Sequence, residues 1–256
     1  VDSIPLIASS IMSKKIAEGA GGLVLDVKVG SGAFMKDRGS AEQLARTMVG
    51  LGHDAGLPTS AVLTDMSAPL GRAVGNACEV QESLEVLAGG GPADLVELVL
   101  ELARRMLALA GVDDDPADAL ADGRAMDSWR RMIAAQGGDP DAELPRARHE
   151  QEVVAAEGGT VQGIEALGIG TASWSLGAGR ERSQDPVQAG AGVLLHVERG
   201  QQVRAGQRLA TLMTDTPEAF ERAEQLVLGA ISVGPDRPQA SSRADVVLGV
   251  VEFEDL

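Results

Sequence analysis

The chain has 256 residues, of which 44% are apolar and 23% charged, so it can bury one large or two medium hydrophobic cores. Its 38 acidic residues outnumber its 22 basic residues and give a net charge of −16, which repels nucleic-acid phosphates and anionic lipid and excludes both as partners. A single cysteine excludes an intramolecular disulfide and a cysteine-based zinc site, and without an apolar run of about 18 residues the expected location is the cytoplasm.

Residues 1–18 are predicted to begin the chain with a helix. Asp2 or Ser3 suits the N-cap, and Pro5 suits the first turn, where its missing N–H costs nothing. Apolar residues recur at helical spacing and form a stripe that has to pack against another element. This stripe consists of Ile4, Ile7 and Ile11.

The same helix carries a candidate binding face. Ser10 and Lys14 are four residues apart, so they lie about 40° from each other around the helix axis and can contact one ligand. Ile11 lies at the edge of this face and adds an apolar wall, which suits a flat heterocycle. Lys15 points about 100° away and is predicted to be a solvated surface charge.

The next segment predicts an α/β unit. Residues 21–29 (GGLVLDVKV) are typical of a strand buried on both faces, and residues 58–65 of a second strand parallel to it. A helix is expected between them at about 40–55. The Gly30-Ser31-Gly32 loop lacks the spacing of a nucleotide-binding glycine loop and is predicted to be a structural turn. Further helices are expected at about 77–87, 92–110, 116–121 and 127–136.

A polar segment rich in proline and glycine, 137–148, predicts a boundary before a second module. Residues 150–163 and 192–213 alternate apolar and polar side chains with glycine-containing turns, like the hairpin of a biotinyl or lipoyl carrier. A carrier needs an acceptor lysine there, and the four lysines, at 14, 15, 28 and 36, all lie upstream. The carrier function is therefore excluded.

The predicted fold class is α/β, with a parallel mixed sheet flanked by helices. It is preceded by a remnant helix of an all-α domain, 1–18, and the central α/β domain spans 19–148. A smaller α+β module follows at 149–256. Surface or capping roles are expected for His53, His149 and His196, core positions for Trp129, Trp174 and Cys78, and solvent exposure for Asp113, Asp114 and Asp115.

Several motifs in order carry a family resemblance. The runs VDSIPLIASSIMSKKIAEGAGGLVLDVKVGSGAFMKD, LTDMSAPLGRAVGNACEV, RMIAAQGGD and LGAGR resemble thymidine and pyrimidine-nucleoside phosphorylases, from Val1 to about Leu228. The resemblance implies reversible phosphorolysis, in which inorganic phosphate as co-substrate displaces the base of a pyrimidine nucleoside, with no organic cofactor. It also implies a homodimer whose helical and α/β domains close over the substrates.

The sequence departs from the family at its start. The Lys-His-Ser-Thr-Gly-Gly phosphate loop and the base-gripping arginine that family members carry before this region do not occur in it. We therefore expect the chain to be the C-terminal part of a phosphorylase and to be inactive alone. We also expect the stripe of Ile4, Ile7 and Ile11 to lack the helices on which it would pack.

The resemblance assigns roles to individual residues. Ser10, Ile11 and Lys14 match the residues that contact the base, and Lys14 is expected to stabilise the negative charge that builds on the departing base. A monovalent or divalent cation is expected at the residues that match the oxygen ligands of some family members, which are Leu70, Ala73 and Glu82.

Three alternatives remain at this point. The enzyme acts on thymidine alone or broadly on uridine and thymidine, because the part that discriminates at the 2′-position is largely absent from the sequence. An anthranilate-type phosphoribosyltransferase has a similar fold, but the module after Glu150 favours a phosphorylase. The third alternative is a non-catalytic fragment that folds without turnover.

Overall fold

The computed structural model describes residues 3–180, 182–235 and 245–256, which form two compact units. Among these residues, unit 1 comprises 3–67, 94–118 and 245–256, and unit 2 comprises 68–93, 119–180 and 182–235. This division differs from the expected boundaries 1–18, 19–148 and 149–256. The reason is strand pairing, because the C-terminal strand joins the sheet of unit 1 and a strand near residue 74 joins the sheet of unit 2.

The sheet of unit 1 has three strands in the order β1-β2-β10. Strands β1 (Leu23–Val29) and β2 (Thr59–Asp65) run parallel in register from Leu23↔Thr59 to Val29↔Asp65, as the sequence predicts. Strand β10 (Val247–Val251) runs antiparallel along the other edge of β2. The sheet is therefore mixed, and β2 is buried over its first six residues. The expectation that β1 is buried on both faces is wrong, because only Leu25, Val27 and Val29 on one face are buried.

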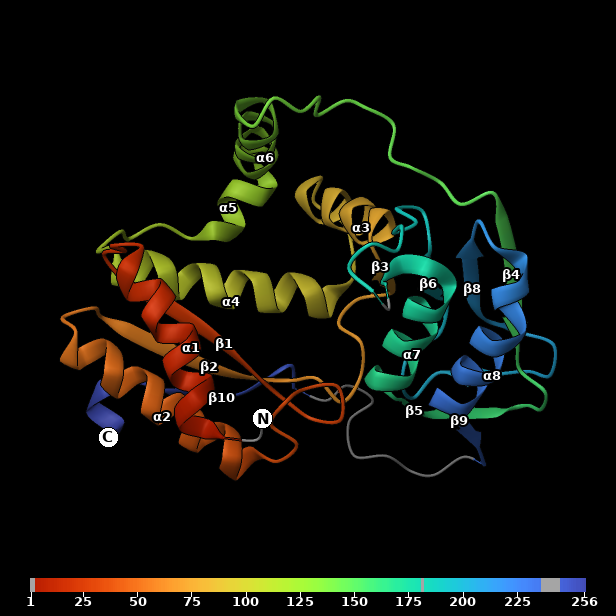
Figure 1. The fold of residues 1–256 in the computed structure, drawn as a ribbon, viewed down its shortest axis with the longest axis horizontal. Coiled ribbons are helices and arrows are strands. Elements are labelled where there is room, and N and C mark those ends of the chain that lie inside the picture. Colours follow the sequence, from red (N-terminus) through yellow and green to blue (C-terminus); the bar gives the residue numbers. More distant parts are fainter. Residues whose placement is uncertain (1–2, 181, 236–244) are drawn as a thin grey trace. The chain divides into compact units, whose positions relative to one another are not determined.

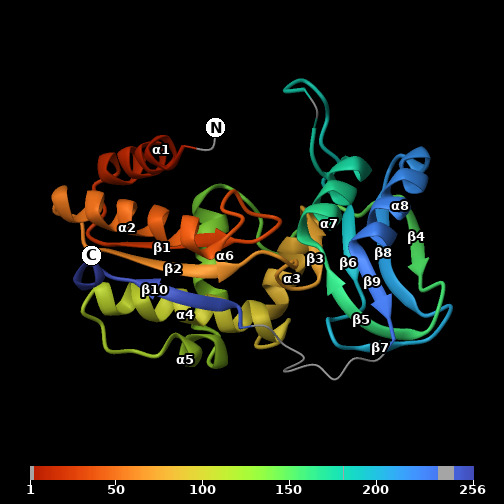
Figure 2. The same ribbon diagram turned by 90° about the horizontal axis from the view of Figure 1, so that it is seen from below.

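Helices cover both faces of this sheet (Figures 1 and 2). Helices α1 (Ile4–Ala17) and α2 (Arg38–Asp54) lie on one face, and α4 (Ala93–Leu109) lies on the other. At the start of α2, the Asp37 carboxylate accepts a hydrogen bond from the Ser40 N–H at 2.9 Å, and this bond lowers the pKa of Asp37. At the start of α1, Ser3 occupies the N-cap without a side-chain bond to the helix, and Asp2 lies outside the described residues.

Helix α1 packs on the same core as α2. Ala8 and Met12 are buried, and the predicted stripe of Ile4, Ile7 and Ile11 packs half-buried against that core. The expectation that this stripe would lack a partner within the chain is wrong. The small Ala8 lets α1 approach α2 closely, so the stripe is covered by the α/β unit itself.

Unit 2 is built from two small antiparallel sheets and the helices packed on them. The first sheet has the order β3-β6-β8-β4 and the second the order β7-β5-β9. The strands are β3 (Ala73–Gly75), β4 (His149–Val154), β5 (Gly159–Ile164), β6 (Gly192–Leu195), β7 (Gln202–Val203), β8 (Arg208–Thr214) and β9 (Ile231–Gly234). The predicted strand-rich module after residue 149 is thereby confirmed.

The helices of unit 2 include two that the sequence analysis did not identify, α7 (Ala166–Ser173) and α8 (Phe220–Ala230). They enclose the core of the unit together with Val193, Leu195 and Leu212. The chain continues from α7 through residues Trp174–Ala178, where Gly177 leaves the helical conformation with φ 104°. Helix α3 (Ala77–Leu87) appears as expected, α5 (Pro116–Ala121) joins the two units in sequence, and α6 (Arg124–Ala135) begins three residues before its predicted start.

The core positions predicted for Trp129, Trp174 and Cys78 are wrong, because all three are half-buried. Trp129 lies on α6, a helix that buries no residue completely. The Trp174 ring lies 5.7 Å from the Arg222 guanidinium, a cation–π contact. Helical spacing indicates which face of a helix is apolar but not whether another element covers it. Here the neighbouring elements cover these residues only in part.

Candidate membrane spans are absent from the described ranges, since none of their helices combines enough length with enough hydropathy.

The C-terminus is tied to unit 1 by a polar network. Glu252 Oε1 accepts hydrogen bonds from Ser60 Oγ on β2 at 2.8 Å and from the Arg105 guanidinium on α4 at 3.0 Å. Ser60 is buried, so its hydroxyl depends on this partner. One carboxylate therefore links the sheet, α4 and the C-terminal segment.

Replacing Glu252 should consequently weaken unit 1. We expect Glu252→Ala to lower the free energy of unfolding by about 1–2 kcal/mol, because the buried hydroxyl and the guanidinium lose their acceptor. Urea unfolding followed by circular dichroism measures this, with the exposed Glu254→Ala as the matched control. Equal midpoints for the two variants would show that the network does not stabilise the unit.

Candidate functional sites

The loop after β1 closes on the end of β2. The Gly30 N–H donates to the Met35 carbonyl and the Gly32 N–H to the Met66 carbonyl, each at 3.0 Å. Gly30 has φ 130°, and a Cβ at this position would lie 2.5 Å from Ser67 Oγ, so only glycine fits. Because these N–H groups are used to close the loop, they are not free to hold a phosphate. The structure thus confirms the predicted structural turn.

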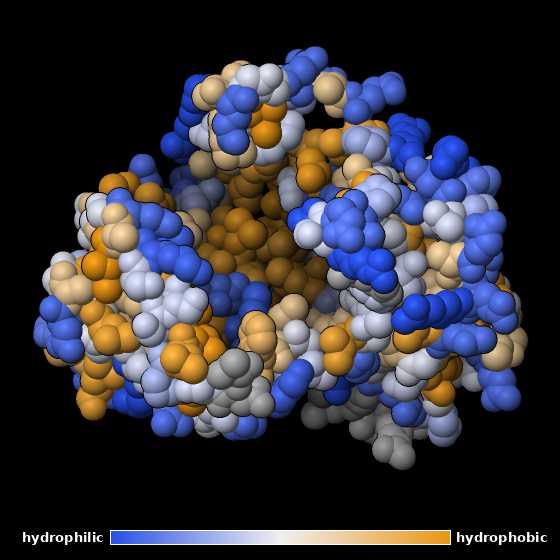
Figure 3. Space-filling model, in the orientation of Figure 1, coloured by the Kyte–Doolittle hydropathy of each residue, from blue (hydrophilic) through white to orange (hydrophobic). Residues whose placement is uncertain are grey.

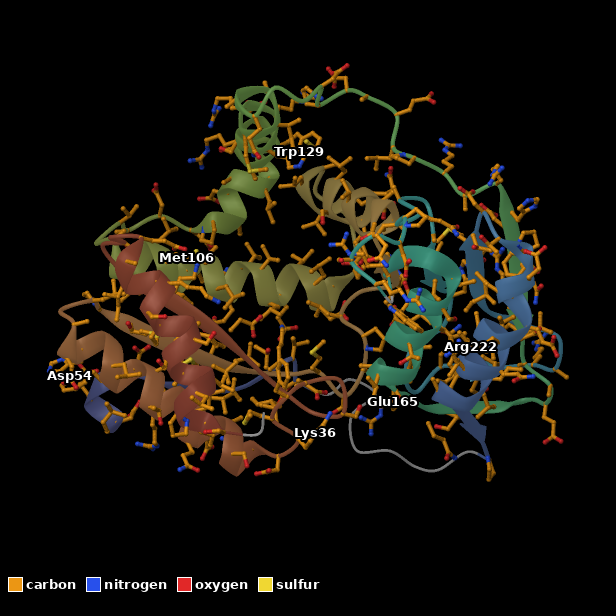
Figure 4. The ribbon with its side chains drawn as sticks, viewed as in Figure 1. Lys36, Asp54, Met106, Trp129, Glu165 and Arg222 are labelled. Atoms are coloured by element: carbon orange, nitrogen blue, oxygen red, sulfur yellow. The ribbon has the colours of Figure 1, made fainter. Side chains whose placement is uncertain are left out.

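Two residues of this loop were not singled out from the sequence. Phe34 is 82% exposed, the highest value among the exposed large hydrophobic residues. Lys36 donates from Nζ to the Ser31 carbonyl at 2.7 Å and lies on the loop between β1 and α2 (Figure 4). The carboxyl ends of parallel strands are where α/β sheets bind ligands. Phe34 and Lys36 are therefore candidate ligand-binding residues because of their position in the fold. The only sequence signal was an aromatic residue in a glycine-rich loop.

The face predicted on α1 is accessible. Ser10 and Lys14 are exposed on one side of the helix, and Ile11 is half-buried beside them. Lys15 instead pairs with Glu18 at 3.1 Å, as befits a surface charge. Lys14 forms no ion pair with any residue that the structure describes. In both views the N-terminal end of α1 lies at the same end of unit 1 as the loop after β1 (Figures 1 and 2).

Unit 2 contains a cavity of about 860 Å³. Helix α3 forms one wall, the segment 140–147 another, and the open face of β6 and β8 the floor. Its lining mixes cations and acids, among them Arg72, Glu82, Glu85, Arg146 and His196. The volume suits a small ligand, but the mixed charge selects no class of ligand.

His196 is half-buried in this cavity and not at the surface as expected. Its Nε2 lies 2.8 Å from Thr211 Oγ1 on the neighbouring strand. Burial, and then the positive charge of Arg208, lower the pKa of His196. The other histidines fit the surface prediction, since His149 is exposed and His53 stacks on Phe253 with ring centroids 3.5 Å apart.

The Cys78 thiol also faces the cavity, packed between Gly75 and Gly192. Burial, followed by the charge of Glu79, raises the pKa of Cys78 and keeps the thiol protonated. Cys78 therefore acts here as a packing residue, in contact with the two glycines.

The predicted cation ligands lie around one turn. Glu82 is only 7% exposed, and its Oε1 accepts hydrogen bonds from the N–H groups of Arg72 at 2.9 Å and Ala73 at 3.2 Å. The Arg72 carbonyl points to β6, where it accepts a hydrogen bond from the Leu195 N–H. Backbone groups of successive strand residues point to opposite sides, so the Ala73 carbonyl points away from β6, toward Glu82.

The cation ligand set is nevertheless small. Leu70, Ala73 and Glu82 would supply three oxygens, whereas hard cations take about six to eight. Among the described residues, no group of three or more His, Cys, Asp or Glu side chains could hold a metal ion. The carboxylate also has a structural role, because it satisfies the backbone of the turn.

Two family models match the chain. The α/β domain of a glycosyl transferase family matches residues 1–128, and the pyrimidine nucleoside phosphorylase C-terminal domain matches residues 160–234. The second match falls within unit 2 and covers the strands β5 to β9.

Known proteins are similar over most of the chain. Thymidine phosphorylase of Mycobacterium tuberculosis is 56% identical over 240 residues, which are 93% of this chain and 56% of that protein. Pyrimidine-nucleoside phosphorylases of Staphylococcus epidermidis and Bacillus subtilis are 45% and 46% identical, over 85% and 86% of this chain and 53% and 54% of those proteins. The chain thus spans about half the length of these relatives.

The pKa of His196 predicts a pH dependence of stability. Because this pKa lies below that of an unfolded histidine, about 6.5, the unfolded state binds more protons in acid. Neutral His196 therefore contributes fully to the free energy of unfolding above about pH 6.5. This contribution is lost as the pH falls through the pKa of His196 in the folded state. We expect His196→Gln to reduce the loss of thermal stability below about pH 6.5.

Thermal midpoints measured from pH 7.5 down to pH 5 test this, with the exposed His149→Gln as control. A wild-type slope retained in His196→Gln would contradict the assignment.

Proposed function

Because the chain belongs to the pyrimidine-nucleoside phosphorylase family of glycosyl transferases, we propose that it carries the base-binding part of an enzyme for reversible nucleoside phosphorolysis. The proposed reaction converts thymidine and phosphate into thymine and 2-deoxyribose 1-phosphate. A phosphate oxygen bonds to C1′ as the bond from C1′ to N1 of the base breaks. Broad action on uridine and thymidine is the second candidate, supported by the similarity to pyrimidine-nucleoside phosphorylases.

The observation that carries this proposal is the accessible ammonium of Lys14 beside Ser10 on α1. A pyrimidine presents carbonyl acceptors and a ring N–H, so Lys14 can donate to a carbonyl while Ser10 bonds at the ring edge. Negative charge grows on the base as the glycosidic bond breaks. A positioned ammonium stabilises that charge more than it stabilises the neutral substrate, which lowers the barrier.

Apolar groups would hold the ring in place. Ile11 provides a half-buried wall beside the polar pair on α1. Phe34 offers an exposed ring face at the end of the sheet where α/β folds bind ligands. Closure of these groups on the base would exclude water, so that phosphate and not water attacks C1′.

A phosphoribosyltransferase of the anthranilate type is the nearest alternative reaction. The match of residues 160–234 to a pyrimidine nucleoside phosphorylase domain supports the phosphorylase. The resemblance also supports a homodimer for the complete enzyme. The molar mass of the joined protein described below, measured in solution, tests the homodimer. Twice the mass of one chain would support it.

The reaction is tested with two proteins. One is the chain alone, and the other is the chain joined to the segment of the Mycobacterium tuberculosis relative that lies outside the match, which should supply the phosphate loop. We expect thymine release only from the joined protein. In the joined protein, Lys14→Ala should lower kcat/KM. The corresponding loss of transition-state stabilisation should be about 2.7–4 kcal/mol, the scale for loss of one charge-stabilising donor.

Lys15→Ala is the matched control, because Lys15 is the adjacent lysine and pairs with Glu18 on the surface. It should retain activity, and both variants should keep the wild-type denaturant midpoint within about 0.5 kcal/mol. Near-normal turnover of Lys14→Ala would contradict the proposed role of Lys14 in stabilising the departing base. A loss of activity that parallels a loss of folding stability would contradict it as well. A joined protein that folds but releases no base would favour the non-catalytic alternative.

We also propose that a cation binds at Leu70, Ala73 and Glu82. Binding to the folded state alone would raise the thermal midpoint with ion concentration. Potassium and magnesium chloride are to be compared with choline chloride at equal ionic strength, and Glu82→Gln should abolish any specific shift. Identical midpoints in all three salts, measured on the joined protein, would refute the site.

A further inference from the structure

The loop that follows β1 exposes one large aromatic side chain between two buried neighbours. Phe34 is 82% exposed, whereas Ala33 and Met35 are buried. Figure 3 shows isolated hydrophobic side chains at several places on the surface, so exposure alone does not mark a functional residue. What distinguishes Phe34 is how the backbone on either side of it is held.

Hydrogen bonds hold this loop to the end of β2 and to itself. The Gly32 N–H donates to the Met66 carbonyl at 3.0 Å. The Ala33 N–H donates to the Gly30 carbonyl, also at 3.0 Å. Within the described part of the chain, Phe34 takes part in no hydrogen bond of its own. The position of its ring is therefore set by the residues on either side of it.

Lys36 closes the loop from its other end. Its Nζ donates to the carbonyl of Ser31, five positions away across Phe34, at 2.7 Å (Figure 4). The bond is charge-assisted, and such bonds are shorter and stronger than those between neutral groups. Asp37 follows directly, but its carboxylate accepts from the N–H and the Oγ of Ser40 at the start of α2, at 2.9 and 2.8 Å. The Lys36 ammonium therefore ties the start of α2 back to the end of β1.

We propose that Lys36 is a positioning residue, which holds the loop 30–36 in one conformation and so keeps the Phe34 ring in place for the pyrimidine base. This inference rests on the proposed function, in which Phe34 contacts the base. A ring on a mobile loop would have to be ordered when the base binds, and that ordering would reduce affinity. The bond from Lys36 to Ser31 orders the loop beforehand.

Two other roles for Lys36 would have different consequences. A solvated surface lysine contributes nothing to binding, which is the usual case for exposed charges. A lysine that contacts the substrate phosphate would instead supply a local cation, which a chain with a net charge of −16 needs for an anion. The geometry favours positioning, because the ammonium is held against the backbone of the loop.

The positioning role has a kinetic signature. The ring contacts the base equally in the substrate and in the transition state, so loss of this contact raises KM and leaves kcat unchanged. Lys36→Met keeps the length of the side chain and removes its donors. In the joined protein it should raise the KM for thymidine by about three- to tenfold, the range that corresponds to one hydrogen bond. The KM for phosphate and kcat should change by less than about twofold.

Three further variants serve as controls. Lys36→Arg keeps a cationic donor at the same position and should restore the KM for thymidine. Lys15→Met removes one lysine charge from the exposed ion pair with Glu18 and should leave all three constants unchanged. The double variant Phe34→Leu, Lys36→Met should bind thymidine no more weakly than Phe34→Leu does, because Lys36 acts through the ring.

The bond between Lys36 and Ser31 is tested on the chain alone, without any reaction. Chymotrypsin cleaves after aromatic residues, and cleavage after Phe34 needs a loop that opens from its hydrogen bonds. Lys36→Met should speed this cleavage by about threefold or more, followed as release of the fragment 1–34 by mass spectrometry. Cleavage after Phe253, which stacks on His53 near the far end of α2, should keep its rate and is the internal control.

Several results would overturn the role of Lys36. They are equal rates of cleavage after Phe34, an unchanged KM for thymidine, a raised KM for phosphate, failure of Lys36→Arg to restore binding, and full additivity in the double variant. An active joined protein in which Phe34→Leu keeps the wild-type KM for thymidine would overturn it too, because the ring would then not contact the base. A joined protein that folds but releases no base would instead refute the proposed function, and this inference with it.

Discussion

The parallel pairing of β1 with β2 is the constraint on which unit 1 depends. Parallel strands cannot be joined by a tight turn, so the chain has to leave the sheet after β1, form α2 and return to β2. This connection brings both carboxyl ends to one edge. There the loop after Val29 closes against Met66 and Ser67, and it exposes Phe34 instead of burying it.

The rest of the unit follows from that pairing. The residues of β1 that alternate toward α2 form the core on which α1 packs, through Ala8 and Met12. Burial of this face of α1 leaves Ser10 and Lys14 in solvent. The polar pair is therefore accessible because the opposite side of the helix is held, and a lysine of this helix can serve a ligand without contributing to the core.

Sequence and structure agree best where a pattern is local. The two parallel strands, the helices near α2, α3 and α4, and the strand-rich module all follow from periodicity and turn residues within short windows. Predictions that depend on contacts between distant segments were wrong or missing. Glycine and alanine obscure α7, so no apolar stripe marks it, and the half-buried tryptophans look like core residues because their helices are apolar on one face.

By itself the sequence determined the kind of elements, the family resemblance and the spacing of Ser10 and Lys14, since each depends on residue order alone. Only the tertiary structure decided that β10 returns from the C-terminus to pair with β2, because its pairing joins residues almost 190 positions apart, Val62 and Val250 among them. The same holds for the burial of Glu82 and for the half-buried position of His196. Burial is a property of contacts between distant segments, which no local pattern encodes.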